Sequence, residues 1–230
     1  MRQCIINYQD KDVLARLEQF GFKCYPVIAS DRVSDPIMAH SDVLYRKVNN
    51  DTFIISSCQK ANKPVLEAAG YKVVLYDNLS PGYRTECGLN FIINEKYRIY
   101  NPDTAIDLTQ FNIENGQENI LTKQGYTACS TLQVTEDAYI TEDENIYNAL
   151  KKAGIDCLII SKGEVSLPGY EYGFIGGASA KITESEILFF GDFENKSEKQ
   201  KIIDFTNKYN IKSVFIENKK LIDLGSSVIF

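Results

Sequence analysis

The chain repeats one pattern five times, at intervals of 42 to 48 residues. Each repeat begins with two short apolar-alternating segments, which are typical of a pair of β-strands. Four pairs are continuous and cover residues 42–45 and 52–55, 89–93 and 97–100, 131–134 and 138–141, and 179–182 and 187–190. The fifth pair is divided between the chain ends, at 227–230 and 3–6. Repeats of about 20–50 residues are typical of solenoids, propellers and arrays. A unit shared by both ends favours the closed ring among these.

The third unit shows most clearly how a repeat is built. After its strand pair, Thr141-x-x-Glu144 predicts a capping box at a helix start, and Gly154 stands where a left-handed residue ends a helix. The apolar run 157–160 then reads as a buried closing strand. Ser197-x-x-Gln200 repeats the capping pattern in the fourth unit. The predicted order is therefore strand, strand, helix, strand.

These patterns predict an α/β fold, a five-fold pseudo-symmetric propeller of ββαβ units within a single domain over residues 1–230. The approximate units are 225–230 plus 1–39, 40–84, 85–127, 128–175 and 176–224. The second unit is expected to keep only a weak helix or a long loop, because residues 101–124 are rich in Asn, Gln and Thr. The predicted ring surrounds a central channel.

Composition excludes several classes of partner. The net charge is −6 and the basic residues form no stripe, so no nucleic-acid partner is expected. No apolar run reaches transmembrane length and the first residues do not resemble a signal peptide, which predicts a cytoplasmic protein with no membrane partner. The six cysteines lack zinc-ligand spacing, so neither a metal nor a cofactor is expected. The sequence does not indicate an oligomeric state.

The architecture resembles the pentein superfamily, the five-bladed α/β propellers that include dimethylarginine dimethylaminohydrolases, arginine deiminases and amidinotransferases. The superfamily also includes a non-catalytic ribosome anti-association factor. The segments His40-Ser-Asp-Val and 167–177, together with Asp192, resemble those of small uncharacterised bacterial members near the amidinotransferases. The guanidine-modifying branch uses a cysteine just after the Gly-rich start of its last unit. This chain has Gly225-Ser-Ser227 there, without a cysteine.

If the ring is correct, the residues that lead into the five units converge at its centre. These lead segments are His40–Asp42, Glu86–Asn90, Cys129–Thr131, Gly176–Ser179 and Gly225–Ser227. Small and polar residues at the start of apolar strands predict a compact hydrogen-bonding pocket. The lead segments are therefore expected to bind a small polar or amino-acid-like ligand through Asn90, Ser130, Thr131, Gly176, Gly177, Ser179 and Ser226.

Candidate catalytic residues lie in the same segments. His40 is the single histidine and is suited to act as a general base. Cys87 and Cys129 hold equivalent positions and are the candidate nucleophiles, while Asp42 or Glu86 is expected to orient the imidazole. The same residues also fit structural roles, in which His40 satisfies a local hydrogen bond and the cysteines pack at a crowded centre. A disulfide between the two cysteines is a further alternative.

Two loop charges and three tyrosines complete the prediction. Arg84 is expected to clamp a carboxylate, and Glu171 to pair with a guanidinium or amine, unless both are ordinary exposed charges. Two Pro-Gly turns precede lead segments, at Gly82 and Gly169. Tyr83, Tyr170 and Tyr172 would then wall the channel mouth or pack over the strand ends.

Two functional hypotheses follow. In the first, the protein binds a guanidino-like or amino-acid-like ligand in the channel, as a binding protein or as a cysteine-dependent C–N hydrolase or amidinotransferase-like enzyme. In the alternative, it is a non-catalytic propeller scaffold that binds a protein partner.

Overall fold

The computed structural model describes residues 2–113 and 116–230 of the chain. Within them, the strands form five separate sheets of three strands each. The sheets consist of β15 (Ser227–Ile229), β1 (Arg2–Ile6) and β2 (Phe22–Pro26); β3 (Tyr45–Lys47), β4 (Thr52–Ser56) and β5 (Lys72–Tyr76); β6 (Ile92–Ile93), β7 (Tyr97–Tyr100) and β8 (Glu118–Leu121); β9 (Thr131–Thr135), β10 (Ala138–Thr141) and β11 (Asp156–Ile159); and β12 (Ser179–Thr183), β13 (Glu186–Phe189) and β14 (Lys212–Phe215).

Every sheet has the same internal pairing. Its first two strands are antiparallel and its second and third are parallel. A parallel pair requires a crossover, and four of the five crossovers contain a helix. These helices are α1 (Lys11–Gln19), α3 (Lys63–Ala68), α4 (Glu144–Lys152) and α5 (Lys196–Asn207). The predicted ββαβ unit is confirmed, and the chain-end strands β15 and β1 pair as predicted.

In the described residues of the second unit, the crossover has no α-helix, in agreement with the weak helix or long loop predicted from its composition. Its crossover contains the short 3₁₀ helix η3 (Leu108–Phe111), which ends at Asn112 in the left-handed conformation. Asp107 caps η3 by accepting a hydrogen bond from the backbone N–H of Thr109. Short 3₁₀ segments of this kind are typical connectors.

Three local predictions differ from the structure. Residues 42–45 were expected to be a strand, but Ser41–Leu44 form the single helical turn α2 and the strand β3 begins at Tyr45. The cap of α4 is Asp143 rather than Thr141, and the cap of α5 is Asn195 rather than Ser197. Each cap side chain accepts hydrogen bonds from the backbone N–H groups two and three residues further along the chain.

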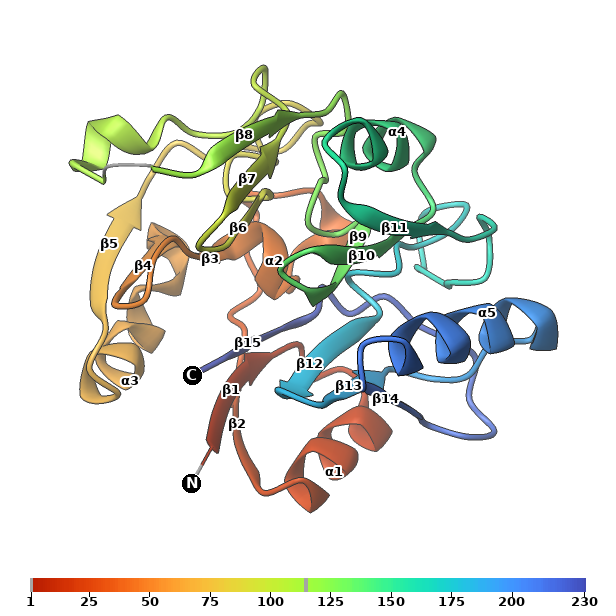
Figure 1. Cartoon of the computed structure of the whole chain (residues 1–230). Coiled ribbons are helices and arrows are strands. Elements are labelled where there is room, and N and C mark those ends of the chain that lie inside the picture. The colour runs from red at the N-terminus through yellow and green to blue at the C-terminus, as the bar shows by residue number, and fades with distance from the viewer. Residues whose placement is uncertain (1, 114–115) are drawn as a thin grey trace.

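The five sheets follow one another in sequence order around the middle of the molecule (Figure 1). At the centre, β12 lies against β9 and β15, and α2 lies against β15. The connections η1 (Asp35–Ile37) and η2 (Ser57–Asn62) are also short 3₁₀ turns. The first strand of each unit therefore lines the centre, while the crossover helices lie outside.

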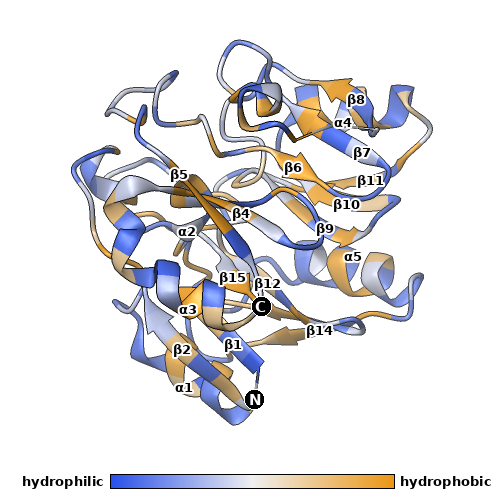
Figure 2. Cartoon of the chain, turned by 90° about the vertical axis from the view of Figure 1, so that its left-hand side faces the viewer, coloured by the Kyte–Doolittle hydropathy of each residue, from blue (hydrophilic) through white to orange (hydrophobic). Residues whose placement is uncertain are grey.

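Apolar residues, orange in Figure 2, recur along both the helices and the strands. Val13 and Leu17 of α1, Ile146 and Leu150 of α4, and Ile202 of α5 are fully buried. The longest described helix, α5, has 12 residues, and no helix in the described ranges has the length and hydrophobicity of a membrane span.

Candidate functional site

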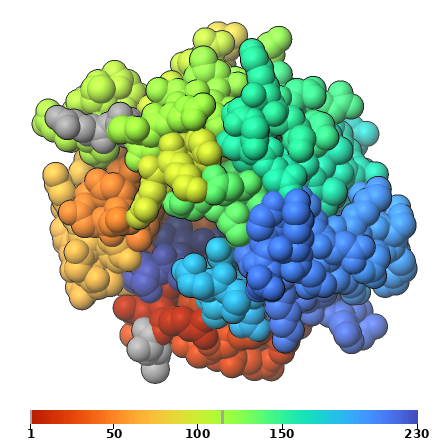
Figure 3. All heavy atoms as spheres, in the orientation of Figure 1, coloured from red at the N-terminus to blue at the C-terminus, as the bar shows by residue number. Residues whose placement is uncertain are grey.

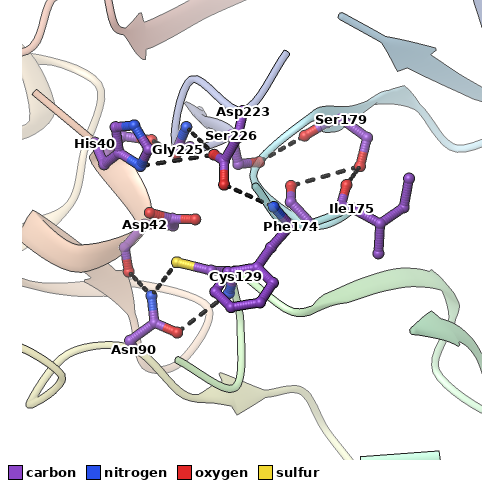
Figure 4. A network of polar contacts seen from close by, with 12 residues as sticks. His40, Asp42, Asn90, Cys129, Phe174, Ile175, Ser179, Asp223, Gly225 and Ser226 are labelled. Atoms are coloured by element: carbon purple, nitrogen blue, oxygen red, sulfur yellow. Dashed lines mark hydrogen bonds and ion pairs between the residues drawn. The ribbon is translucent and has the colours of Figure 1, made fainter. Parts of the chain in front are cut away.

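The lead segments meet at the centre and form a buried polar layer (Figure 4). His40 and Asp223 come from the two ends of the chain, and both are 2% exposed. His40 Nδ1 lies 3.6 Å from Asp223 Oδ1. Asp223 also accepts hydrogen bonds from the backbone N–H groups of Phe174 and Gly225, each at 2.9 Å. This carboxylate thus joins the first and last lead segments to the loop that precedes the fourth.

Asn90 organises the neighbouring part of the layer. Its Nδ2 donates to the carbonyl of Asp42 at 3.0 Å and to the Sγ of Cys129 at 2.9 Å. Its Oδ1 accepts from the backbone N–H groups of Ala128 and Cys129. One amide side chain therefore fixes the position of the Cys129 thiol relative to α2 (Figure 4).

Glycine is required where the backbone approaches these side chains. A Cβ atom at Gly177 would overlap the Asp223 carboxylate, and one at Gly225 would overlap His40. Gly225 also has a φ of +73°, a conformation that favours glycine. Its neighbour Ser226 has a φ of +58°, and its Oγ donates to the carbonyl of Ser179 at 2.8 Å. The last lead segment is therefore a close-packed turn.

Beyond this layer lies a cavity of about 260 Å³ that we call the polar cavity. Residues from the first strands of all five units line it (β3, β6, β9, β12 and β15). In Figure 3, segments from many parts of the chain surround a hollow that has β15 (dark blue) at its floor. Asp42 is one of the lining residues and is 7% exposed, and both oxygens of its carboxylate are buried. Neither carboxylate oxygen makes a hydrogen bond within the described residues, although the carboxylate lies close enough to the Cys129 thiol to raise the pKa of that thiol.

Other groups in the polar cavity also have free bonding capacity. Thr131 Oγ1 and Ser227 Oγ are buried without a hydrogen-bond partner among the described residues. Three cationic side chains, Arg46, Lys47 and Lys181, line the same cavity. The Arg46 guanidinium is partly used, since it donates to the carbonyls of Leu89 and Asp42. The residues that line the cavity thus combine buried oxygens without a hydrogen bond in the described ranges with three cationic side chains.

A second cavity, also of about 260 Å³, shares no lining residue with the first. His40, Cys129 and Asp223 line it, together with a wall of aromatic rings from Tyr126, Tyr170, Tyr172 and Phe174. We call it the aromatic cavity. At the centre, the described residues therefore form these two separate cavities where the sequence predicted one channel.

The electrostatics of the layer favour neutral thiols. Burial, followed by the charges of Asp42 and Asp223, raises the pKa of the Cys129 thiol well above its ordinary value. Burial and the nearby Glu86 raise the pKa of Cys87 to about 12. Burial raises the pKa of Asp223 to about 6, although His40 acts in the opposite direction. Cysteine nucleophiles react as thiolates, which this environment disfavours.

The predicted site residues divide into four groups. Asp42, Thr131, Gly176, Ser179 and Ser226 line the polar cavity. His40, Cys129 and Glu171 line the aromatic cavity. Glu86, Cys87, Asn90, Ser130 and Gly177 line neither, and Arg84 is an exposed residue outside both.

Two predicted partnerships differ in the structure. Glu86 does not contact His40, because its carboxylate accepts from the Ser34 backbone and hydroxyl and from Tyr126. The carboxylate beside the imidazole is Asp223, not Asp42 or Glu86. Cys87 donates to the carbonyl of Tyr83, and both Cys87 and Cys129 are free, so the alternative of a disulfide between them is wrong.

Sequence reasoning missed Asp223, although a simple register identifies it. His40 stands two residues before Asp42, and Asp223 stands two residues before Gly225. Asp42 and Gly225 are equivalent positions of the repeat, so His40 and Asp223 are equivalent as well. Comparing the position two residues before each lead position across the units therefore places His40 and Asp223 together. No such register points to Tyr126 and Phe174, which belong to the loops before the lead segments.

No group of three or more His, Cys, Asp or Glu side chains within residues 2–113 and 116–230 is arranged to hold a metal ion.

The sequence of residues 5–228 matches the model of a family of unknown function (DUF6873). The chain belongs to this family. None of the curated proteins compared with the chain matches it significantly. Membership of this family assigns no function to the chain, so a function has to be inferred from the residues of the site.

Solved structures with a similar fold include an amidinotransferase, an arginine dihydrolase and an agmatine deiminase. An amidinotransferase of the saxitoxin pathway from Microseira wollei has a TM-score of 0.60 at 9% identity, over 94% of this chain and 77% of that one. The N-terminal domain of a cyanobacterial arginine dihydrolase has a TM-score of 0.55 at 9% identity, over 99% and 95%. Agmatine deiminase from C. jejuni has a TM-score of 0.50 at 12% identity, over 94% and 75%. All three are pentein superfamily members, which confirms the predicted fold.

Proposed function

We propose that the protein binds a small amino-acid-like molecule with a guanidino or amino group in the polar cavity. The observation that carries the proposal is the Asp42 carboxylate, which is buried without a hydrogen-bond partner in the described chain. Leaving a buried charged acceptor unpaired is costly, so a cationic donor from a ligand would stabilise this arrangement. A guanidinium presents several N–H donors in a plane and suits such a carboxylate.

The positive side chains of the cavity favour a ligand whose other end is negatively charged. Lys47 and Lys181 are less buried than Asp42, and both line the cavity. A carboxylate on the ligand would meet these ammonium groups while its cationic end reaches Asp42. This division of charge favours a zwitterion over a simple amine.

The last unit favours binding without a covalent step in this cavity. It presents Ser226 and Ser227 where the guanidine-modifying penteins carry their cysteine, and no cysteine or histidine is among the described lining residues. A serine hydroxyl needs an adjacent base to act as a nucleophile. Ser226 instead donates to a backbone carbonyl.

Calorimetric titration with three ligands tests the proposal. L-Arginine is expected to bind more tightly than agmatine, which lacks the carboxylate, and far more tightly than L-citrulline, whose side chain is neutral. The variant Asp42→Asn should weaken arginine binding at least about tenfold, because hydrogen bonds to charged groups contribute roughly 1.5–3 kcal/mol. Lys181→Ala should reduce the difference in affinity between arginine and agmatine. Glu171→Gln, in the aromatic cavity, is the matched control and should change nothing. Equal affinity for arginine and citrulline, or no saturable binding, would overturn the proposal.

A second candidate function is a cysteine-dependent C–N hydrolase or amidinotransferase-like enzyme with its site in the aromatic cavity. The supporting observation is that His40, Cys129 and Asp223 line that cavity together, although they come from distant parts of the sequence. In this mechanism Cys129 Sγ attacks the carbon of the C–N bond, His40 takes the thiol proton and passes it to the nitrogen that leaves as an amine, and Asp223 orients the imidazole. Water, or an acceptor amine in the transferase, then displaces the sulfur and regenerates the thiol. The raised pKa of Cys129 weighs against it, and thiol labelling decides between the two candidates.

A further inference from the structure

The aromatic cavity has features of a second binding site that differ from those of the polar cavity. Tyr126 and Phe174 pack with ring centroids 6.3 Å apart, and Tyr172 meets Phe174 edge-on at 6.1 Å. Tyr170, which is 47% exposed, lines the cavity too. The rings of Tyr126, Phe174 and Tyr172 thus form one packed cluster, and Tyr170 adds a more exposed ring to the lining.

The rings at the base are held in place by buried carboxylates. The hydroxyl of Tyr126 donates to Glu86, which is 2% exposed. The backbone N–H of Phe174 donates to Asp223 at 2.9 Å. The wall is therefore positioned before any ligand arrives, which lowers the entropic cost of binding.

The charge around the aromatic cavity is negative. Asp223 lies at its base, Glu171 is a further lining residue, and Glu86 stands directly behind Tyr126. Among the described lining residues, His40 is the single basic side chain, and it lies beside Asp223. This surrounding favours a cation over a neutral or anionic occupant.

The cavity offers that cation few hydrogen-bond acceptors. Asp223 already accepts from Phe174 and Gly225 and lies against His40. The carboxylate of Glu86 is likewise occupied. A guanidinium or primary ammonium would lose hydrogen bonds to water here without replacing them. A methylated ammonium needs no hydrogen bonds and is attracted to the faces of aromatic rings.

We propose that the aromatic cavity binds a small quaternary or methylated ammonium compound, with its cationic head between the rings of Tyr126, Tyr170, Tyr172 and Phe174. The volume of about 260 Å³ is slightly below the range of about 300–1,000 Å³ usual for ligand pockets, so the occupant is small. This site is separate from the polar cavity, so the inference does not depend on the ligand proposed there.

Calorimetry with choline and its neutral carbon analogue 3,3-dimethylbutan-1-ol tests this inference at constant ionic strength. The two molecules have nearly the same shape and differ in charge. Choline is expected to bind at least about fivefold more tightly, because a cation–π contact contributes about 1 kcal/mol or more when partly desolvated. Equal binding of both molecules would mean an ordinary apolar pocket, and no saturable choline binding would also overturn the proposal.

Variants locate the site. Tyr170→Leu and Phe174→Leu keep apolar bulk but remove the ring, and each should weaken choline binding several-fold. Tyr170 is exposed, so its variant is expected to fold even if the Phe174 variant does not. Tyr8→Leu is the matched control, because Tyr8 is 44% exposed and lines neither cavity. Lys181→Ala, in the polar cavity, should also leave choline affinity unchanged. Equal losses in the controls and in Tyr170→Leu would contradict the proposed location.

Discussion

Single residues at the centre decide what chemistry is available. Asp42 and Cys129 hold equivalent positions of the repeat, yet they line different cavities. Asn90 joins the two, because it donates to the Asp42 carbonyl and to Cys129 Sγ. The thiol of Cys129 is thus enclosed between the amide of Asn90 and the carboxylates of Asp42 and Asp223, while the Asp42 carboxylate makes no hydrogen bond within the described residues.

The first residue-scale prediction concerns the Cys129 thiol. Burial and the neighbouring carboxylates raise its pKa, so native Cys129 should not react with iodoacetamide between about pH 6 and 8 and should react after denaturation. Peptide mapping of labelled protein measures this. Cys24, which is half-buried, serves as an internal comparison and should react with iodoacetamide at a lower pH than Cys129. Selective labelling of Cys129 below pH 7 that is lost in His40→Ala would contradict this prediction and support the hydrolase.

The second concerns Asp223, whose pKa is about 6 in the folded protein against about 3.9 in an unfolded chain. The folded state then holds the proton more tightly. The stabilising contribution of protonation is therefore fully present below about pH 4 and is lost as the pH rises through about 6. We expect the free energy of unfolding of the wild type, minus that of Asp223→Asn, to rise as the pH is lowered from about 7 to 5 in urea titrations. A difference that falls over this interval would mean that His40 holds Asp223 ionised.

At the scale of elements, the helices are set by short-range interactions that the sequence only partly reveals. The motifs at Thr141 and Ser197 predicted the helix starts to within a few residues, but the caps are Asp143 and Asn195. Thr141 lies inside β10, where its hydroxyl donates to the carbonyl of Ser130. A capping motif and a strand end overlap there, and tertiary contacts decide between them.

The corrected cap of α5 gives a direct prediction. Asn195→Ala should lower the free energy of unfolding by about 1 kcal/mol, because it removes the acceptor for the N–H groups of Ser197 and Glu198. Ser197→Ala should have little effect, since its hydroxyl only contacts Asn195. Chemical denaturation of both variants measures the difference. A larger loss for Ser197→Ala would restore Ser197 as the cap.

The helical turn α2 shows why one element could not be predicted from periodicity. The run Asp42–Tyr45 is short and apolar, and such runs fit a buried strand or a buried helical turn equally well. Here the turn α2 lies against β15, and the backbone N–H of Asp42 donates to the carbonyl of Gly225. A contact between opposite chain ends thus fixes the local conformation. Most other strands were predictable, because alternation and turns mark them locally.

At the scale of the whole molecule, the last residues hold several units together. Phe230 exchanges backbone hydrogen bonds with Gln3, Ser226 donates to the carbonyl of Gly177, and the carbonyl of Gly225 accepts from Asp42. The segment therefore belongs to the centre of the fold. The sequence predicted this role from the divided repeat. The sequence could not predict that the lead segments separate two cavities. The repeat places these segments at the centre but does not indicate which of their residues line which cavity.

Removal of residues 225–230 should therefore abolish cooperative unfolding. The deletion takes away β15, a wall of the polar cavity and the contacts to three units. Near-ultraviolet circular dichroism and thermal unfolding measure the loss of fixed packing. The milder variant Ile229→Ala is the control and should unfold cooperatively at a lower temperature. A truncated protein that unfolds cooperatively within about 1 kcal/mol of the wild type would show that the segment is a dispensable tail.

The central claim is that the free carboxylate of Asp42 receives the cationic end of a small ligand. A crystal structure of the protein grown with L-arginine tests it most directly. The account predicts the guanidinium within hydrogen-bond distance of Asp42 Oδ1 or Oδ2, with the ligand carboxylate towards Lys47 or Lys181. An empty polar cavity at saturating arginine, or an Asp42 carboxylate bonded to a donor of the protein itself, would contradict it.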